Sequence, residues 1–262
     1  MRYVEPKTFL TGATAITTGL DEYLEYSGNQ EFREAIEQAR NNGLSDGEIL
    51  CSFYAKLCYK SLTLGWNANV SRIRDIESNL AGCFDSGHGS VFEHCFLNFV
   101  TTDCSRVFTH ELVRHRVGTA YSQTSGRYVA LDNIDFIIDP LLVEDNECDQ
   151  VIQELLLKIE DTAKFLRDKL IKDGDPFSKK KKITSAIRRI APNGQANEIG
   201  WSMNIRSVRN TLVLRTSEHA EWEIRLVFNQ VGDIVEAKYP LMLHGLVKVN
   251  TGDGLVSWVE DQ

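Results

Sequence analysis

Apolar residues in this chain follow a helical spacing in most segments and a strand-like alternation in a few, and this mixture limits the possible folds. The longest helical pattern covers residues 149–172, with one apolar stripe made of Val151, Leu155, Ile159, Ala163, Leu166 and Leu170. We expect further helices over 30–60 (with a loop at 41–43), 70–84, 105–116, 178–190, 207–216 and 219–238. Strands are expected over 92–100 and from Gly126 onward. Because strands and helices do not alternate regularly, the pattern predicts an α+β fold of mixed helix and sheet.

Length and composition are those of an ordinary globular protein. The chain has 262 residues, of which 42% are hydrophobic and 25% charged, so we expect one domain over 1–262 with a core of its own. No apolar run approaches the roughly 18 residues of a membrane span, and the N-terminus lacks a signal-peptide pattern. The six cysteines form no CxxC pair. We therefore expect a cytoplasmic protein with reduced thiols and no membrane partner.

The charge distribution indicates a small anionic ligand. A net charge of −8, from 29 basic and 37 acidic residues, argues against non-specific nucleic-acid binding, which needs a basic face. The arginines nevertheless concentrate in two regions, 114–127 and 188–215. Because the guanidinium group suits phosphate and other planar acceptors, these regions are candidates for anion binding.

Several familiar catalytic motifs are absent. The sequence has no GxxxxGK[ST] loop, no GxGxxG turn and no GxSxG elbow. His110 and His115 bracket a segment that resembles the zinc-protease HExxH motif, but they are five residues apart rather than four. At about 100° per residue, the second imidazole is turned away from the first. We therefore expect no metal site.

Two stretches are unusually rich in hydrogen-bond donors. Arg114-His115-Arg116 is followed by Ser125-Gly126-Arg127-Tyr128, and a second stretch contains Asn204, Arg206, Asn210 and Arg215. Clustered positive charges repel unless an anion lies among them, although an exposed basic patch paired with local acids remains an alternative. Between 88 and 94, His88 and His94 are candidates for binding or for ordinary capping and core roles.

Together these segments resemble the flavin-dependent thymidylate synthase family. Its signature is Arg-His-Arg followed at a fixed interval by Ser-x-Arg-Tyr. Further matching segments are Ala55-Lys56-Leu57-Cys58-Tyr59, His88 to His94, Pro192, Asn204-Ile205-Arg206-Ser207, Asn210, Leu214-Arg215 and Ser217 to Ile224. The resemblance covers residues 51–228.

The resemblance implies FAD as cofactor and a homotetramer with active sites shared between subunits. The reaction it implies is methylation of dUMP to dTMP, with methylenetetrahydrofolate as carbon donor, reduced FAD as hydride donor and NADPH as reductant. The cofactor residues it implies are His88, Ser90, Arg114, His115, Arg116, Gln123, Asn204, Arg206 and Asn210. The nucleotide residues are Glu111, Arg114, Gln123, Ser125, Gly126, Arg127, Arg188 and Arg215. Arg215 is the catalytic candidate, because a fixed guanidinium favours negative charge on the uracil ring.

Two departures from the family pattern affect the nucleotide pocket. Eight residues rather than seven separate Arg116 from Ser125, and Ser122-Gln123 replaces the usual Asn-Glu. Glu111 occupies a position that is usually glutamine, and we expect it to pair with Arg114 or His115, three and four positions further on. The substrate thus remains open between dUMP, UMP and another pyrimidine, and the transferred group between methyl and hydroxymethyl. A non-catalytic nucleotide- or RNA-binding protein is the alternative of a different class.

Overall fold

An antiparallel sheet forms the centre of the structure, a computed structural model that describes residues 2–126 and 135–261. Its four strands, in spatial order, are β1 (Lys7–Ala13), β2 (Phe96–Cys104), β4 (Asn197–Asn204) and β3 (Thr119–Gln123). The register places Trp201 of β4 opposite Phe99 on one side and Tyr121 on the other. Segments about 80 to 100 positions apart in the sequence thereby become neighbours, and the expectation of mixed helix and sheet is confirmed.

Two C-terminal helices pack on the sheet. α8 (Ile205–Arg215) contacts β4, and α9 (Trp222–Lys238) contacts β1. The rings of Phe99 and Trp201 stack at 4.4 Å, and Trp201 also contacts Phe228 of α9 at 5.9 Å between centroids. Large aromatic side chains removed from water supply much of the packing energy of a core. The sheet, and α8 with its buried Ile205, Val208 and Leu212, are therefore a firm support for side chains that extend from them.

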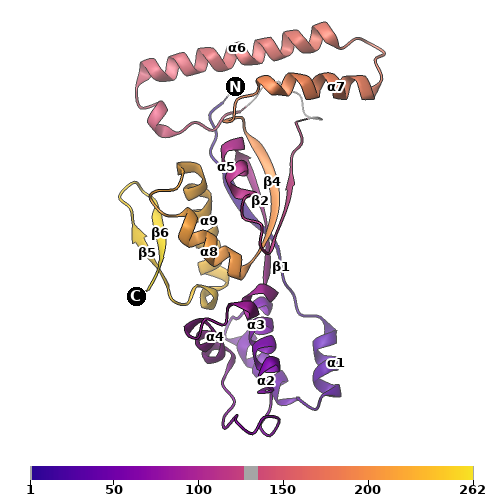
Figure 1. The fold of residues 1–262 in the computed structure, drawn as a ribbon, viewed down its shortest axis with the longest axis vertical. Helices are drawn as coiled ribbons and strands as arrows, with labels where there is room; N and C mark the ends of the chain where they lie inside the picture. The colour runs from indigo at the N-terminus through magenta and orange to yellow at the C-terminus, as the bar shows by residue number, and fades with distance from the viewer. Residues whose placement is uncertain (1, 127–134, 262) are drawn as a thin grey trace.

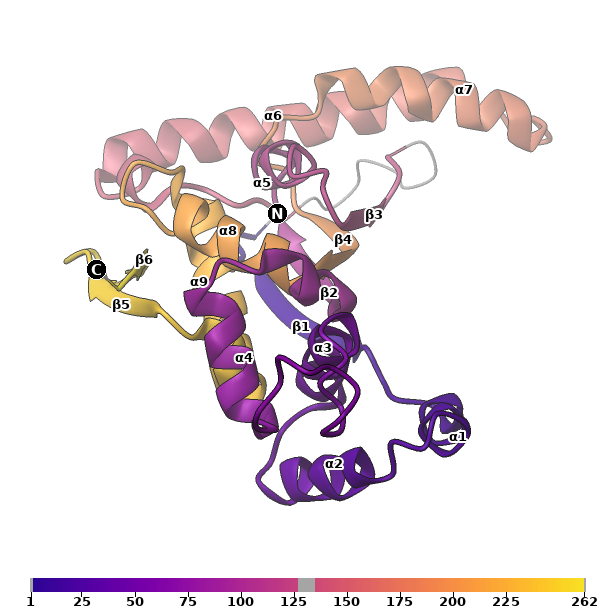
Figure 2. The same cartoon turned by 60° about the horizontal axis from the view of Figure 1, so that its bottom comes forward.

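Four N-terminal helices form one end of the molecule in both views (Figures 1 and 2). They are α1 (Thr18–Tyr26), α2 (Glu31–Asn41), α3 (Asp46–Cys58) and α4 (Ile76–Asp85), followed by the 3₁₀ segment η1 (Gly89–His94). The expected helix over 70–84 begins only at residue 76. Asp75 caps it by accepting from the Ser78 backbone N–H at 2.6 Å, and such a cap fixes a helix start.

The segment after β2 is shorter as a helix than its sequence predicted. α5 (Arg106–Leu112) begins at Ser105, which accepts from the Phe108 N–H at 3.1 Å. It ends four residues before the expected Arg116, because the chain turns at Gly118 (φ +63°) to enter β3, and this left-handed conformation suits glycine. Apart from Gly126, the strand expected from that residue onward falls largely outside the described residues.

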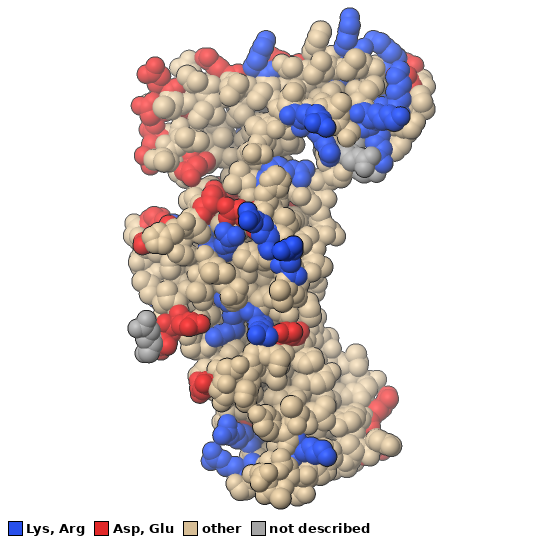
Figure 3. Space-filling view, viewed as in Figure 1, with Lys and Arg blue, Asp and Glu red and all other residues tan. Residues whose placement is uncertain are grey.

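A pair of helices, α6 (Asn146–Leu170) and α7 (Phe177–Ile187), lies at the other end of the molecule. Their small core contains Phe136, Leu156, Ala163 and Ile187. The expected apolar stripe is wrong at three positions, since Val151, Leu155 and Leu170 are 61%, 58% and 46% exposed. Acidic side chains gather near the start of α6 and basic ones over α7 (Figure 3).

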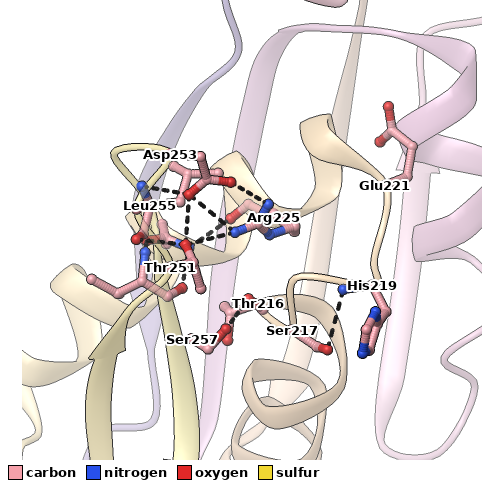
Figure 4. A network of polar contacts seen from close by, with 12 residues as sticks. Thr216, Ser217, His219, Glu221, Arg225, Thr251, Asp253, Leu255 and Ser257 are labelled. Carbon is pink, nitrogen blue, oxygen red and sulfur yellow. Dashed lines mark hydrogen bonds and ion pairs between the residues drawn. The ribbon is translucent and has the colours of Figure 1, made fainter.

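The C-terminal hairpin is tied to α8 and α9 by polar contacts (Figure 4). It follows the 3₁₀ segment η4 (Pro240–Leu243) and consists of β5 (Leu246–Asn250) and β6 (Val256–Glu260). The buried Arg225 of α9 donates to Asp253 at 2.5 Å and to Thr251 at 2.9 Å. Ser257 donates to the Thr216 carbonyl at 2.7 Å. Two further 3₁₀ segments, η2 (Pro140–Leu142) and η3 (Arg188–Ile190), flank the α6–α7 pair.

Candidate active site

The last residue of α8, Arg215, is held by two side chains from the region of α5. Its Nη1 donates to Oε2 of Glu111 at 3.0 Å, and its Nε donates to Nε2 of His115 at 2.9 Å. Arg215 and Glu111 are 23% and 29% exposed, so the ion pair is partly withdrawn from water. A half-buried guanidinium held through two of its nitrogens by two different side chains has little freedom of orientation. Its remaining nitrogen, Nη2, has no partner among the described residues.

His115 acts in this arrangement as a neutral acceptor. Burial, and then the nearby charge of Arg215, lower the pKa of the His115 imidazole. A neutral ring with its proton on Nδ1 leaves the Nε2 lone pair free to accept from Arg215. The backbone at this position is also fixed, since Thr119 Oγ1 donates to the His115 carbonyl at 2.8 Å and the Tyr121 hydroxyl donates to the same oxygen.

The expected pairing of Glu111 with Arg114 or His115 is wrong. The helix ends at Leu112, so the residues three and four positions beyond Glu111 no longer follow helical geometry. Glu111 instead pairs with Arg215, which is 104 positions away. Arg114 and Arg116 are exposed on the turn between α5 and β3, where their guanidinium groups are accessible to a ligand.

The start of α8 is built from the second predicted donor stretch. The buried Asn204 caps the helix by accepting from the Ser207 N–H at 2.9 Å, and its own N–H donates to the Gly118 carbonyl at 2.9 Å. A Cβ atom at Gly118 would lie 2.0 Å from Nδ2 of Asn204. Glycine is therefore required for this close approach, which fixes the Arg-His-Arg turn against α8.

Three of the predicted cofactor residues line one cavity of about 410 Å³, namely His88, Ser90 and Arg206. Arg206 donates from Nη1 to Oε1 of Glu93 at 2.5 Å, and its Nε lies 3.1 Å from where a Cβ of Gly89 would be. The His88 ring stacks on Tyr59 at 5.9 Å. Asn210 is exposed on α8, one turn beyond Arg206. Arginine, asparagine, serine and histidine donors fit a group such as FAD, which carries two phosphates and ring carbonyls.

A second cavity, of about 460 Å³, contains the predicted nucleotide residues Gly126 and Arg188. It lies between α5, η3 and the end of β3. Ser125 immediately precedes Gly126, whereas Arg127 lies outside the described residues. Gln123, assigned to both ligands, donates from Nε2 to Oγ1 of Thr109 at 2.8 Å.

Within one chain, eight of the predicted residues therefore form three groups. His88, Ser90 and Arg206 share one cavity, Gly126 and Arg188 share another, and the two cavities have none of their described lining residues in common. Arg215 forms the third group with Glu111 and His115.

The sequence interpretation missed three residues at these groups. They are Glu93, Thr109 and Arg106, which contact Arg206, Gln123 and the second cavity. Arg106 at the start of α5 and His110 in its last turn are four positions apart and line the same cavity, a spacing that places two side chains on one helix face. That spacing was the feature of the sequence from which Arg106 could have been identified.

Comparisons with known proteins agree on a single family. The sequence profile of the family described as "Thymidylate synthase complementing protein" matches residues 3–241. A flavin-dependent thymidylate synthase of Mycobacterium sp. (strain KMS) is 34% identical over 190 residues, which are 68% of this chain and 72% of that protein. The chain belongs to the flavin-dependent thymidylate synthase family.

Other relatives support the same assignment. A flavin-dependent thymidylate synthase of Clostridium tetani is 32% identical over 182 residues, covering 68% of this chain and 73% of that protein. The crystal structure of Thymidylate Synthase X from Helicobacter pylori with FAD and dUMP has a TM-score of 0.58. It covers 90% of this chain and 96% of its own at 17% identity, which shows a common fold. The predicted family and the prediction of an enzyme are confirmed.

Proposed function

We propose that this enzyme methylates dUMP to dTMP, with methylenetetrahydrofolate as carbon donor, FAD as cofactor and NADPH as reductant. The observation that carries the proposal is the fixed guanidinium of Arg215, held by Glu111 and the neutral His115. Uracil's fifth carbon attacks a carbon donor only when negative charge develops on the ring. A preorganised cation whose Nη2 has no partner among the described residues can stabilise that charge without reorganising.

The other groups supply binding. His88, Ser90 and Arg206, with Asn210 and the Arg114–Arg116 turn, hold FAD, which supplies hydride transfer when bound. Gln123 lies between the two ligands, and Asn204 fixes the start of α8. The cavity with Gly126 and Arg188 receives the nucleotide phosphate, together with Ser125 and Arg127 from the same loop.

We propose that the enzyme is a homotetramer with shared sites and functions in the cytoplasm. Arg206 and Asn210 lie on one face of α8, whereas Arg215 is nine positions after Arg206 and, at about 100° per residue, projects from the opposite side. Residues that face apart in one subunit contribute most simply to different active sites. The six cysteines are unpaired, in keeping with a reducing compartment. Among the described helices, none is long and apolar enough to cross a membrane.

The test is a substrate panel with product mass analysis. The FAD-loaded protein is supplied with methylenetetrahydrofolate, NADPH and one of dUMP, UMP or deoxycytidine monophosphate. We expect a methylated product from dUMP alone. A hydroxymethyl product, or turnover of another nucleotide, would establish the related C5-transfer alternative. Absence of a flavin absorption band after FAD is added would favour the non-catalytic nucleotide-binding protein.

Two sets of variants test which residues bind the flavin and which act in catalysis. Arg206→Ala with Asn210→Ala is expected to weaken flavin retention, while Arg215→Ala is expected to keep the flavin and lose about a hundredfold or more in turnover. Near-wild-type turnover of Arg215→Ala would remove this residue from the mechanism.

A further inference from the structure

Arg106 is a half-buried cation whose hydrogen-bond partners among the described residues are all neutral. Its Nη2 donates to the Thr124 carbonyl at 3.3 Å. The amide of Asn197, with its oxygen toward the guanidinium, accepts from Nη2 at 3.1 Å and from Nε at 2.6 Å. These contacts join the end of β3 to the start of β4. These contacts satisfy the two acceptors, but a neutral donor would satisfy the same acceptors equally well. They therefore do not account for a positive charge at Arg106.

A second guanidinium group lies beside the first. A Cβ atom at Gly126 would be 3.8 Å from Nη2 of Arg106 and 3.6 Å from Cδ of Arg188. Burial, and then the charge of Arg188, lower the pKa of Arg106. Two like charges in one partly desolvated place are unfavourable unless an anion compensates them.

The cavity around these two residues has no compensating acid among its described lining residues. It is lined by Arg106, Arg188, Arg189 and His110, together with small and amide side chains. Among the salt bridges of the described residues, none involves Arg106, Arg188 or Arg189. The space of about 460 Å³ is ample for a phosphate group.

Arg106 is also held on a rigid support. Its backbone N–H donates to the Asn193 carbonyl at 2.8 Å, on the loop that lines the same cavity. The preceding residue, Ser105, donates its N–H to the buried Glu223 at 2.6 Å. A binding residue at a fixed helix start is better preorganised than one on a mobile loop.

We propose that Arg106 is a phosphate-binding residue of the nucleotide site, acting with Arg188 on the 5′-phosphate of the substrate. The proposal rests on the proposed function, which places that phosphate beside Arg188. A phosphomonoester carries a charge of about −1.5 to −2 at neutral pH, and two planar guanidinium groups match its charge and its acceptor oxygens. Arg106 is the half-buried member of this pair, and Arg188 the exposed one.

The experiment compares the affinities of dUMP and deoxyuridine by isothermal titration calorimetry on the FAD-loaded protein. We expect Arg106→Gln to weaken dUMP binding at least tenfold and to change deoxyuridine binding less than twofold. The ratio of the two affinities is the readout, because a general distortion of the fold would weaken both ligands. Arg40→Gln, which removes a surface arginine paired with Asp46, is the charge-matched control and is expected to keep the wild-type ratio.

A second variant and a second probe complete the test. Arg106→Lys keeps the charge without the planar fork and is expected to lose severalfold in dUMP affinity. If Arg106→Gln does not fold, the ratio of dUMP affinity to deoxyuridine affinity in Arg106→Lys decides the test. Inorganic phosphate is expected to compete with dUMP in the wild type and to compete more weakly in Arg106→Lys.

Different results would overturn the phosphate-binding function of the cavity and the role of Arg106 in it. If the wild type does not prefer dUMP to deoxyuridine, the phosphate site is misplaced and both the proposed function of this cavity and the role of Arg106 fail. If the wild type prefers dUMP and the Arg106 variants keep that preference in full, the role of Arg106 alone is overturned.

Discussion

Single side chains carry most of the chemical information in this protein, and Arg215 shows how far sequence reasoning reaches at this scale. The residue was a catalytic candidate from the motif around it, because Leu214-Arg215 follows Asn204 to Asn210 at the family's spacing, and its catalytic role stays a prediction. Its partners were not recognisable. Glu111 is 104 positions away, near the end of α5, and only the tertiary fold brings it to the end of α8. A local rule of helix spacing gave Glu111 the wrong partner because the helix ends one residue later.

Glu111→Gln tests whether the carboxylate positions Arg215. The glutamine keeps an acceptor but removes the charge, so we expect turnover to fall about tenfold, less than on loss of the arginine itself. We expect dUMP to bind at least as tightly, because a carboxylate near the nucleotide is removed. Steady-state kinetics and calorimetry with dUMP and deoxyuridine check both statements.

The control is Glu236→Gln, which breaks the surface pair with Lys248 and is expected to leave turnover unchanged. Unaltered turnover in Glu111→Gln would show that His115 alone suffices to hold the guanidinium. Equal binding of deoxyuridine and dUMP by the wild type would contradict the placement of the phosphate.

Glu223 makes stability depend on pH. Burial raises its pKa to about 7, against the hydrogen bonds from Ser105. Between the ordinary value of 4.5 and about 7, the folded state holds a proton that the unfolded state has released, so stability falls as pH rises through this window. At about 1.4 kcal/mol per pKa unit, the contribution is at most roughly 3 kcal/mol.

Thermal unfolding between pH 4.5 and 7.5 measures this effect. Glu223→Gln removes the titrating group, so we expect its unfolding temperature to fall less with rising pH. The exposed Glu34→Gln is expected to show the same fall as the wild type. The same slope in Glu223→Gln would assign the decline to other groups.

Elements were predictable where their own sequence determined them. The expected helix over 149–172 agrees closely with α6, and helices close to α7, α8 and α9 were expected. The strands β1, β3 and β4 and the hairpin β5–β6 were not expected. The strand β4 contains Gly200 and several polar residues and owes its stability to pairing with β2 and β3. The stripe on α6 was assigned wrongly because apolar residues occur on more than one of its faces. Its buried side is set by α7 and Phe136, which the local pattern does not contain.

Gly232 shows how one element constrains another. Glycine inside α9 costs about 1 kcal/mol relative to alanine by helix propensity, yet a Cβ here would lie 2.3 Å from Nε1 of the buried Trp258. We expect Gly232→Ala to lower the free energy of unfolding by about 1–3 kcal/mol, since overpacking outweighs propensity. Urea unfolding measures the change.

Gly19→Ala is the matched control for this variant. A Cβ at Gly19 in α1 meets nothing closer than Oγ1 of Thr17 at 3.5 Å, so the alanine is expected to keep or raise stability. A Gly232→Ala variant as stable as the wild type would mean that the hairpin shifts away from α9 without loss.

At the scale of the whole molecule, one chain keeps the three groups of predicted site residues apart: the cavity at Arg206, the cavity at Arg188, and Arg215 with its partners. The α6–α7 pair and the N-terminal helices lie at opposite ends, with the sheet between them (Figures 1 and 2). The cavity at Arg188 is on the side of α7, whereas the cavity at Arg206 is next to α3, α4 and η1. An enzyme that brings a nucleotide against a flavin needs these surfaces together. The proposed association of copies, with residues 1–262 of each as the one unit expected from the sequence, would bring these surfaces together.

Subunit mixing tests shared sites directly. Arg188→Ala and Arg215→Ala are each expected to be inactive, but co-expressed chains form hybrid oligomers in which one site takes Arg188 from one chain and Arg215 from the other. We expect such hybrids to regain part of the wild-type activity. The matched control mixes Arg188→Ala with Arg106→Gln, two residues of the same cavity in the same chain, and is expected to regain none. Native mass spectrometry verifies that each preparation contains mixed tetramers. Mixed tetramers of the first pair without activity above that of either parent would place Arg188 and Arg215 in the same subunit's site, because only then does every site in the hybrid lack one of them.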